Sequence, residues 1–288
     1  MDYCSIKQYL EKDLARVNAL MRTSLSSDIQ LLDKTNMSLL EHSGKQLRPV
    51  LALLAARACS GGFVTEDTIH YAVATELLHN ATLLHDDVAD DSPTRRGRPT
   101  VMSLLGGRAS VLLGDYWLVK AIDNVLVNKT SSSEVIKVFS RTLADLAEGE
   151  ILQLQKADLG DTAENDYYRI IFNKTASLFV TSAESAAISV SASAEKMKAV
   201  KSYAEYLGIA FQIRDDILDV TSTSQVLGKP INSDEKNHKT TYVTLEGLKK
   251  AEKDVKEISG RAIDVLDQLG RKNEFLRNLI LELVIREK

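Results

Sequence analysis

Hydrophobic residues recur along most of the chain at intervals of three and four positions, the spacing that places them on one side of an α-helix. Short clusters of glycine, proline and serine interrupt this pattern, and we expect them to form loops between helices. They occur at residues 42–49, 60–62, 91–100, 105–107, 128–133 and 227–230. No stretch shows a convincing alternation of apolar and polar residues, so the pattern predicts an all-α protein.

The composition agrees with this prediction. Among 288 residues there are only four prolines, aromatic residues are few, and leucine, alanine, lysine and glutamate are abundant, a balance that favours helix over strand. By its size alone, the chain could form one large domain or two.

Charge and cysteine content exclude several classes of protein. The 36 basic and 40 acidic side chains give a net charge of -4, which argues against a general nucleic-acid binder. The longest apolar run, residues 50–56, is far shorter than the roughly 18 residues of a membrane span. The N-terminal residues do not resemble a signal peptide, and Cys4 and Cys59 fit no metal or disulfide spacing. We therefore expect a cytoplasmic protein without a transmembrane segment, whose membrane contact is at most peripheral.

Two short acidic motifs share one pattern, DDVAD at 86–90 and DDILD at 215–219. On an ideal helix, Asp86 and Asp90 lie about 20° to either side of His79, with apolar residues on the opposite side. Asp215 and Asp219 lie about 40° apart on their own helix. Each motif follows a strongly apolar stretch, where a pair of acids is poor core material. One motif alone would be interpreted as a solvated helix face, but two favour a binding site.

If the two acidic faces meet across a cavity, they require a compensating cation. Two like charges about 4 Å apart repel by about 4 kcal/mol at an effective dielectric constant of about 20. Carboxylate oxygens are ligands for Mg²⁺, which completes its coordination with water and phosphate oxygens. The motifs therefore predict magnesium and a phosphorylated substrate.

Basic residues in or beside the predicted loops could supply the donors that a diphosphate needs, with arginine for planar contacts and lysine as a point charge. Arg95 and Arg96 directly follow the first acidic motif, and Gly97 and Pro99 shape their loop. The other candidates are Lys45, Arg48, Lys174, Lys229 and Lys239. Individually each could be an ordinary surface cation. His79 shares the face of Asp86 and could donate to the diphosphate, whereas His85 lies off that face and is expected to make a structural hydrogen bond.

These motifs resemble those of the all-trans isoprenyl diphosphate synthases, also called polyprenyl synthetases. The resemblance extends over nearly the whole chain, and we expect a single domain over residues 1–288. The matching segments are GKxxRP at 44–49, LLHDDVADDSxxRRGxPT at 83–100, VLLGDYWLVKA at 111–121, EGEILQLQ at 148–155, KTASLF at 174–179, FQIRDDILDVT at 211–221, and GKP followed by KTTY. Ser43 and His238 depart from the family pattern, where glycine is usual, and neither change removes a charge.

The resemblance implies an all-helical bundle around a deep central cavity, usually in a homodimer. It implies that Asp86, Asp90 and Asp215 hold Mg²⁺, with Asp87, Asp216 and Asp219 close by. The allylic diphosphate would be held by Arg95, Lys174, Lys229 and Lys239, with Thr175 and Gln212 beside them. Isopentenyl diphosphate would be bound by Lys45, Arg48, His79 and Arg96. The residues expected to carry the chemistry are Asp86, Asp90, Asp215, Lys174 and Arg95.

The implied reaction is ionisation of the allylic diphosphate, attack by the isopentenyl double bond, and loss of a proton. In this family, bulky residues one or two turns before the first acidic motif stop elongation. Here these positions are Ala81 and Thr82, with Leu78 and Phe139 as candidate floors of the pocket. We therefore expect a product longer than geranylgeranyl diphosphate.

Several alternatives remain open from the sequence. The segment around the second acidic motif is similar to short-chain farnesyl or geranylgeranyl synthases, which conflicts with the prediction of a long product. A class I terpene cyclase would also use aspartate-bound magnesium but would not need the second substrate site. A non-catalytic synthase subunit would be expected to lose aspartates, and this chain has both motifs complete.

Overall fold

The structure, a computed structural model, describes residues 2–42, 44–127, 133–221 and 240–285. Helices dominate the described chain, and its elements follow one another in this order. They are α1 (Tyr3–Tyr9), α2 (Glu11–Leu25), α3 (Gln30–Glu41), α4 (Leu47–Ser60), α5 (Glu66–Ala89), β1 (Thr94–Arg95), β2 (Arg98–Pro99), α6 (Val101–Leu105), α7 (Gly107–Leu126), α8 (Ser133–Leu159), α9 (Glu164–Ile171), η1 (Phe172–Ala176), α10 (Ser177–Ser189), α11 (Ala194–Thr221), α14 (Tyr242–Glu246), α15 (Leu248–Val265), η2 (Leu266–Asn273), α16 (Glu274–Ile280) and η3 (Leu281–Ile285).

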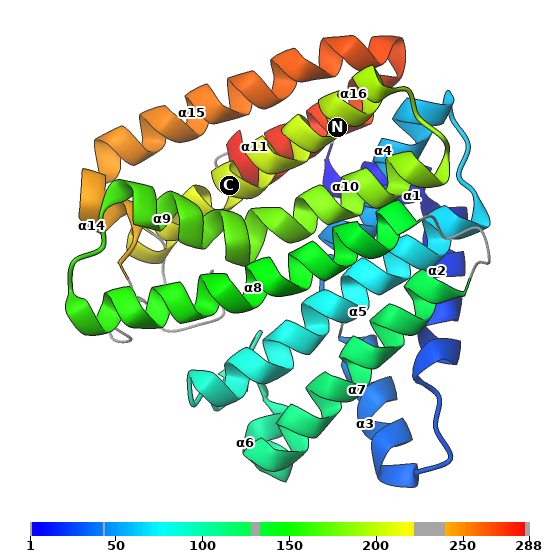
Figure 1. Ribbon diagram of the computed structural model, residues 1–288, viewed down its shortest axis with the longest axis vertical. Helices are drawn as coiled ribbons and strands as arrows, with labels where there is room; N and C mark the ends of the chain where they lie inside the picture. The colour runs from blue at the N-terminus through cyan, green and yellow to red at the C-terminus, as the bar shows by residue number, and fades with distance from the viewer. Residues whose placement is uncertain (1, 43, 128–132, 222–239, 286–288) are drawn as a thin grey trace.

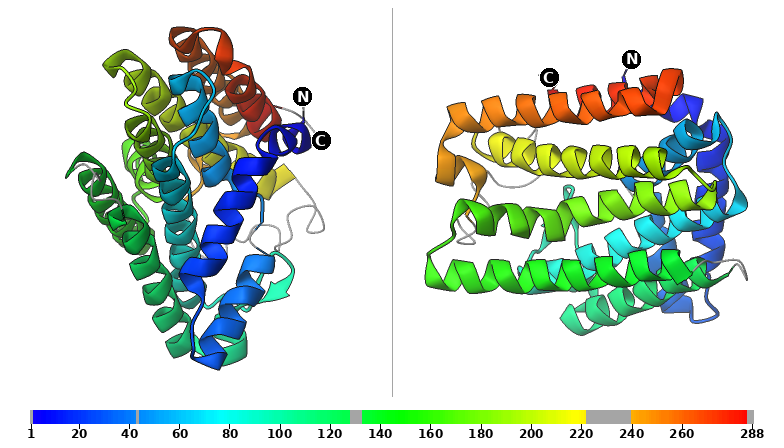
Figure 2. Two further views of the ribbon diagram at one scale, coloured as in Figure 1. Left: turned by 90° about the vertical axis from the view of Figure 1, so that its right-hand side faces the viewer. Right: turned by 45° about the horizontal axis from the view of Figure 1, so that its top comes forward.

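The long helices lie roughly side by side across the molecule. Helix α5 packs between α7 and α10, α10 packs on α11, and α11 is covered by α15 (Figure 1). Helix α8 lies along α10, and the N-terminal helices pack at the opposite end of the bundle from α14 (Figure 2). The C-terminal ends of α5, α8 and α11 point toward the same end of the molecule, at the left of Figure 1. Both acidic motifs therefore reach that end.

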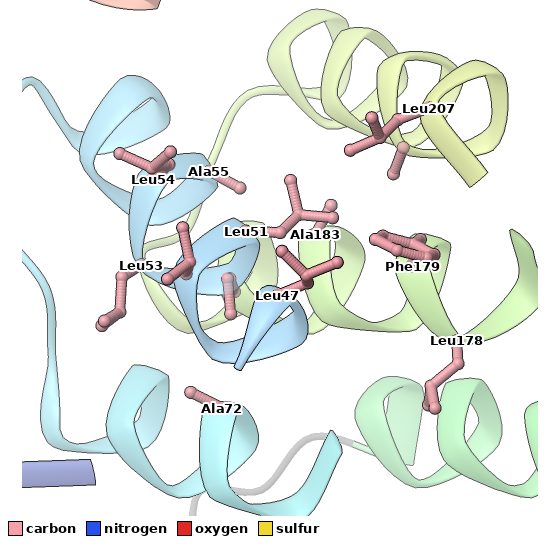
Figure 3. Packing of buried hydrophobic residues seen from close by; sticks show 14 of the residues in the cluster. Leu47, Leu51, Leu53, Leu54, Ala55, Ala72, Leu178, Phe179, Ala183 and Leu207 are labelled. Carbon is pink, nitrogen blue, oxygen red and sulfur yellow. The ribbon is translucent and has the colours of Figure 1, made fainter. Parts of the chain in front are cut away.

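Helix α4 forms the centre of the hydrophobic core. Its sequence is apolar on almost every side, and it packs against α5, α10 and α11. Figure 3 shows its leucines next to Phe179 and Ala183 of α10 and Leu207 of α11. A helix that is hydrophobic all round is expected to be buried, as α4 is.

The predicted all-α fold is confirmed, with one small exception. Residues Thr94–Arg95 and Arg98–Pro99 form an antiparallel pair in which Arg95 lies opposite Arg98. Arg96 and Gly97 form the two-residue turn, with φ angles of 53° and 73°. Positive φ at both turn positions is typical of a tight hairpin. The prediction of a plain loop was wrong here, because strands of two residues are too short to show an alternating pattern.

Among the described residues, no helix is both long and apolar enough to cross a bilayer.

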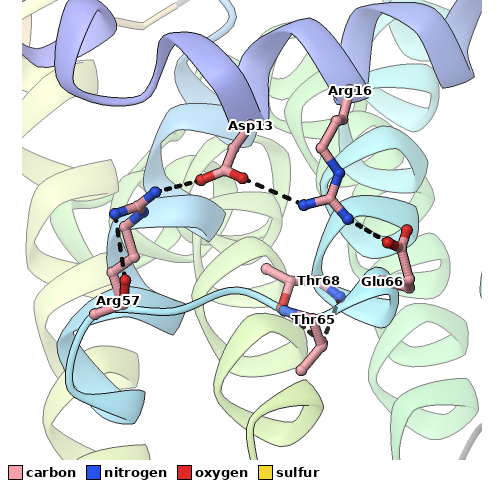
Figure 4. A network of polar contacts seen from close by, with 7 residues as sticks. Asp13, Arg16, Arg57, Thr65, Glu66 and Thr68 are labelled. Carbon is pink, nitrogen blue, oxygen red and sulfur yellow. Dashed lines mark hydrogen bonds and ion pairs between the residues drawn. The ribbon is translucent and has the colours of Figure 1, made fainter.

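A partly buried network of ion pairs ties α2 to α4 and to the start of α5 (Figure 4). Arg57 donates to Asp13 at 2.6 Å, and Arg16 donates to the other oxygen of Asp13 at 3.3 Å. Arg16 also pairs with Glu66, the first residue of α5. Thr65 and Thr68 exchange backbone and side-chain hydrogen bonds that cap α5. The network fixes the helix whose other end carries the first acidic motif.

We expect Asp13→Ala to lower the free energy of unfolding by about 1–3 kcal/mol, because it leaves the partly buried Arg57 without its carboxylate. Urea unfolding followed by circular dichroism measures this change. Glu66→Ala is the matched control, since that side chain is 77% exposed and its ion pair should contribute about 1 kcal/mol or less. Equal losses in both variants would contradict the prediction.

Candidate active site

A cavity of about 670 Å³ opens between α4, α5, the hairpin, η1 and α11. The first aspartates of both motifs, Asp86 and Asp215, line it. Most of the predicted substrate-binding residues also line it, namely Lys45, Arg48, His79, Arg95, Arg96, Lys174, Thr175 and Gln212. Segments separated by up to about 170 positions thus meet in one polar cavity rich in cations.

Other predicted residues lie outside this wall or outside the described chain. Asp90 caps the C-terminus of α5, and Asp219 is buried in α11. Lys229 and Lys239 lie outside the described residues, so their assignment to the allylic diphosphate stays a prediction.

The second aspartate of the first motif is held by a neighbouring cation. Asp87 is buried and accepts a 2.7 Å hydrogen bond from Nε of Arg95. Burial raises the pKa of Asp87, and Arg95 opposes that rise. Because Arg95 is in β1, the pair connects the end of α5 to the hairpin that carries Arg96.

The second aspartate of the other motif has a more extensive set of contacts. Asp216 Oδ2 accepts hydrogen bonds from Tyr167 Oη and from the backbone N–H of Tyr242, both at 2.7 Å. Its Oδ1 accepts from Gln212 Nε2 at 3.1 Å. In both motifs, the first aspartate therefore lines the cavity while the second is engaged by protein donors.

Lys174 and Thr175 lie in a π-helical turn, η1, inside an otherwise continuous helix. The expectation that Lys174 lies in or beside a loop was wrong. Two glycines allow neighbouring helices to approach this turn closely: a Cβ at Gly149 would lie 2.7 Å from Asn173 Cβ, and one at Gly208 would lie 2.6 Å from Ala176 Cα. Single π-helical turns inside helices frequently occur at functional sites.

The Lys174 ammonium is fixed by two residues of α8 that sequence reasoning did not single out. It forms an ion pair with Glu150 and donates to Gln153 Oε1 at 3.0 Å. Burial raises the pKa of the nearby Asp86 carboxyl to about 6; Lys174 opposes this rise, and Glu150 adds to it. The segment EGEILQLQ, which contains both α8 residues, was the available signal.

Arg48 lines the cavity, and burial lowers its pKa to about 10. Its guanidinium carbon lies 4.8 Å from the centre of the Phe179 ring, a cation–π contact. Glu76, which the sequence analysis missed, faces the same cavity, and burial raises its pKa while Arg48 lowers it. Burial and the cations Arg48 and Arg96 keep the pKa of His79 well below its ordinary value. His79 is therefore a neutral donor or acceptor near pH 7.

Gly44 provides room for Arg96. A Cβ at Gly44 would lie 2.5 Å from the Arg96 guanidinium, which donates to the carbonyl oxygen of His42 at 3.3 Å. His85, by contrast, has its Nε2 atom 3.2 Å from Asp115 of α7 and 3.3 Å from the carbonyl of Val111. These contacts agree with a structural role for His85.

A second, mostly apolar cavity of about 270 Å³ lies beside the first, between α5, α7 and α8. Three of the predicted chain-length residues, Leu78, Ala81 and Thr82, line it. Further walls come from Leu118, Leu143, Leu146 and Ala147, which the sequence analysis did not name. Phe139 does not line this cavity; it is buried one turn earlier in α8, with its ring 6.4 Å from that of Tyr71. Thr82, Asp86 and Lys174 border both the polar and the apolar cavity.

A third cavity, of about 170 Å³, lies toward α9 and α14. Its lining includes Gln153, Tyr167, Lys174, Gln212 and Asp216.

The donor set of the main cavity fits a hard divalent cation. Asp86 and Asp215 offer carboxylate oxygens from two different helices, α5 and α11. No three His, Cys, Asp or Glu side chains among the described residues are grouped so as to hold a metal by themselves. Mg²⁺ is commonly bound through one or two carboxylates together with substrate phosphates, so this arrangement suits a metal that arrives with its substrate.

Comparison with known proteins agrees with the geometry. The polyprenyl synthetase family model matches residues 29–275. Octaprenyl diphosphate synthase of Escherichia coli K12 is 37% identical over 248 residues, covering 86% of this chain and 76% of that protein. Among solved structures, heptaprenyl diphosphate synthase from Staphylococcus aureus superimposes with a TM-score of 0.91 at 26% identity, covering 97% of this chain and 99% of the other. Geranylgeranyl pyrophosphate synthetase from Pyrococcus horikoshii gives 0.89 at 27% identity, with 99% of each chain covered.

A helical bundle that brings two aspartate motifs and a ring of cations to one cavity is the architecture of an isoprenoid synthase. The chain belongs to the polyprenyl synthetase family, and the family resemblance seen in its motifs is confirmed.

We expect Gly208→Ala to displace the π-helical turn, because the new Cβ would contact the backbone of Ala176. Overpacking of this kind costs about 1–3 kcal/mol, and it should move Lys174 and Thr175 and so lower turnover. Thermal unfolding and a turnover assay measure the two effects.

Gly260→Ala in α15 is the matched control, since a Cβ there meets nothing within 4 Å. It should leave turnover unchanged and raise stability by about 0.5–1 kcal/mol, the gain expected for alanine over glycine in a helix. Full turnover in Gly208→Ala would show that the close approach is not required.

Proposed function

We propose that this protein is a head-to-tail trans-prenyltransferase that condenses isopentenyl diphosphate with an allylic diphosphate to make a long-chain polyprenyl diphosphate. The observation that carries the proposal is the cavity of about 670 Å³ lined by Asp86, Asp215 and the cations from α4, the hairpin and η1. Family membership and the named long-chain relative support the reaction and the product class.

We assign the cations of the cavity to two groups, one for each substrate. Lys45, Arg48 and Arg96, with neutral His79, form one group, which we assign to isopentenyl diphosphate. Arg95 and Lys174, with Thr175 and Gln212, form the other, which we assign to the allylic diphosphate; Lys229 and Lys239 are predicted to join it. Two separate groups of donors suit a two-substrate condensation better than a one-substrate cyclisation.

Asp86, Asp90 and Asp215 would hold Mg²⁺, with Asp87, Asp216 and Asp219 close by. When bound, the metal supplies positive charge that stabilises the leaving diphosphate. The raised pKa of Asp86 indicates that its anionic form is poorly compensated by the protein alone, which a bound cation would correct.

The protein residues act by charge, position and exclusion of water. Lys174 and Arg95 stabilise the diphosphate as the allylic C–O bond breaks. Arg48 and Arg96 hold isopentenyl diphosphate so that its double bond forms the new C–C bond to the allylic carbon. The proton lost from the adduct passes to the released diphosphate. This chemistry needs no side-chain nucleophile.

The apolar cavity beside Asp86 is the place for the growing hydrocarbon. Its lining includes the small Ala81 together with Leu78 and Leu143. One turn of helix advances about 5.4 Å, close to one isoprene unit, so a bulkier residue one turn nearer the acidic motif should remove about one unit. We infer a product longer than geranylgeranyl diphosphate, and a short product remains the competing outcome.

The proposal is tested by incubating the full-length protein with Mg²⁺, isopentenyl diphosphate and farnesyl diphosphate and sizing the products by mass spectrometry. Polyprenyl diphosphates longer than twenty carbons are expected. Cyclised hydrocarbons would favour a terpene cyclase, and absence of any condensation would favour a non-catalytic subunit.

We expect Ala81→Phe to shorten the main product by at least one isoprene unit, because the phenyl ring would fill the apolar cavity near Asp86. Chromatography of the dephosphorylated products measures the length. Ala144→Phe, on the exposed side of α8, should leave the length unchanged. An unchanged product in Ala81→Phe would exclude Ala81 as a wall residue.

We propose that the protein is a homodimer joined through α7. Leu112, Val119 and Leu126 are exposed by 60%, 53% and 53%, and their spacing of seven residues places them on one side of that helix. Val111 and Ile122 flank them and are also exposed. A two-fold pairing of identical surfaces is the commonest assembly of soluble proteins and would cover this apolar face in both copies. A cytoplasmic location stays a prediction.

The paired substitution Leu112→Glu and Val119→Glu should give a monomer in sedimentation velocity, because it places charges in the proposed interface. Because both side chains are exposed, the substitutions should not disturb the core of the protomer. Any fall in the unfolding temperature would then come from loss of the dimer. The control is Ile29→Glu, at a 61% exposed position outside α7. A dimer in the α7 variant would refute this interface.

A further inference from the structure

Asp216 is 4% exposed and lies at the meeting point of α9, α11 and α14. Tyr167 of α9 and the first N–H of α14, from Tyr242, both donate to its Oδ2. Burial and the neighbouring Asp216 raise the pKa of the Tyr167 phenol, so Tyr167 remains a proton donor. Helix α14 begins three residues after Lys239 in the sequence. The carboxylate therefore has a fixed direction, set by groups outside the cavity.

The other oxygen of Asp216 faces Gln212, one turn earlier on α11. Gln212 Nε2 donates to Asp216 Oδ1 at 3.1 Å, and Gln212 Oε1 accepts from Thr175 Oγ1 at 2.9 Å. A carboxylate can only accept, so it requires the amide nitrogen of Gln212 on its side and leaves the amide oxygen for Thr175. This chain of contacts fixes which edge of the amide faces the cavity, and it leaves the second N–H of Nε2 as a potential donor to a bound phosphate oxygen.

We propose that Asp216 is a positioning residue that acts through Gln212, orienting its amide and the Thr175 hydroxyl toward the allylic diphosphate. The inference rests on the proposed function, because the substrate at this wall of the cavity is assigned there. It gives the second aspartate of the motif a task different from that of Asp215, which lines the cavity directly.

The variant Asp216→Asn replaces the acceptor atom that faces Gln212 with a hydrogen-bond donor. Its oxygen can still accept from Tyr167 and Tyr242, but its NH₂ group would face the NH₂ group of Gln212. The Gln212 amide must then rotate by half a turn to restore a hydrogen bond, and the rotation exchanges the groups presented to Thr175 and the cavity. Because every polar group finds a new partner, the fold should be retained.

The test is a double-variant cycle with Asp216→Asn, Gln212→Leu and the combination, in the full chain with Mg²⁺. We expect each single variant to raise the KM for farnesyl diphosphate about tenfold and to leave the KM for isopentenyl diphosphate within about twofold of wild type. Since both substitutions act through the same amide, the KM of the combined variant for farnesyl diphosphate should also rise about tenfold rather than about a hundredfold.

Tyr203→Phe is the matched structural control. It removes one buried hydrogen bond of the same helix, from Tyr203 Oη to the carbonyl oxygen of Leu276 at 2.6 Å, and leaves Asp216 and Gln212 in place, so it should lower the unfolding midpoint by about 2–4 °C without changing the KM for farnesyl diphosphate. A purely structural role for Asp216 would make the stability and the KM change together in all variants.

Three results would overturn the proposal. These are an unchanged KM in Asp216→Asn, multiplicative effects in the combined variant, or an unfolded Asp216→Asn protein. A raised Mg²⁺ requirement in Asp216→Asn, absent in Gln212→Leu, would instead make Asp216 a metal ligand. Calorimetric binding of farnesyl thiodiphosphate, which does not readily ionise, gives the affinity without turnover. Failure of this inference can therefore be distinguished from failure of wild-type protein to catalyse the reaction.

Discussion

The close packing of one irregular helical turn determines the geometry of the whole site. The turn Phe172–Ala176 lies against α8 and α11 at two glycines, and this contact brings Lys174 to Glu150 and Thr175 to Gln212. A side chain at either glycine would separate helices that must touch for the two halves of the cavity to meet. The positions of the cations and carboxylates depend on this close contact. A charged group can stabilise a diphosphate efficiently only when the protein already holds that group in place.

Within each acidic motif, adjacent aspartates have different surroundings. Asp86 and Asp215 line the cavity, whereas Asp87 is held by Arg95 and Asp216 by Tyr167, Tyr242 and Gln212. Successive positions on a helix point about 100° apart, so one residue of the pair can face the substrate space while its neighbour faces the protein. The protein-facing acids connect the motifs to the hairpin and to α14.

The residue pattern was sufficient to predict the helical fold and the face of α5 that carries His79 and Asp86, because both follow from helical periodicity. The hairpin at 94–99 was missed, since two-residue strands leave no periodic signal and only the positive φ of Arg96 and Gly97 reveals it. The π-helical turn was missed because its one extra residue shifts the apolar spacing by a single position, which is too small a change to mark in one sequence. Glu76, Glu150 and Gln153 were missed because their importance comes from partners on other helices, which one sequence does not display.

Lys174 borders all three cavities that meet at the end of the bundle. One ammonium group therefore lies at the junction between the polar cavity, the apolar cavity and the cavity near α14. Removal of this charge should therefore change substrate affinity, turnover rate and product distribution together. A change in one kinetic parameter could then not be ascribed to a single cavity.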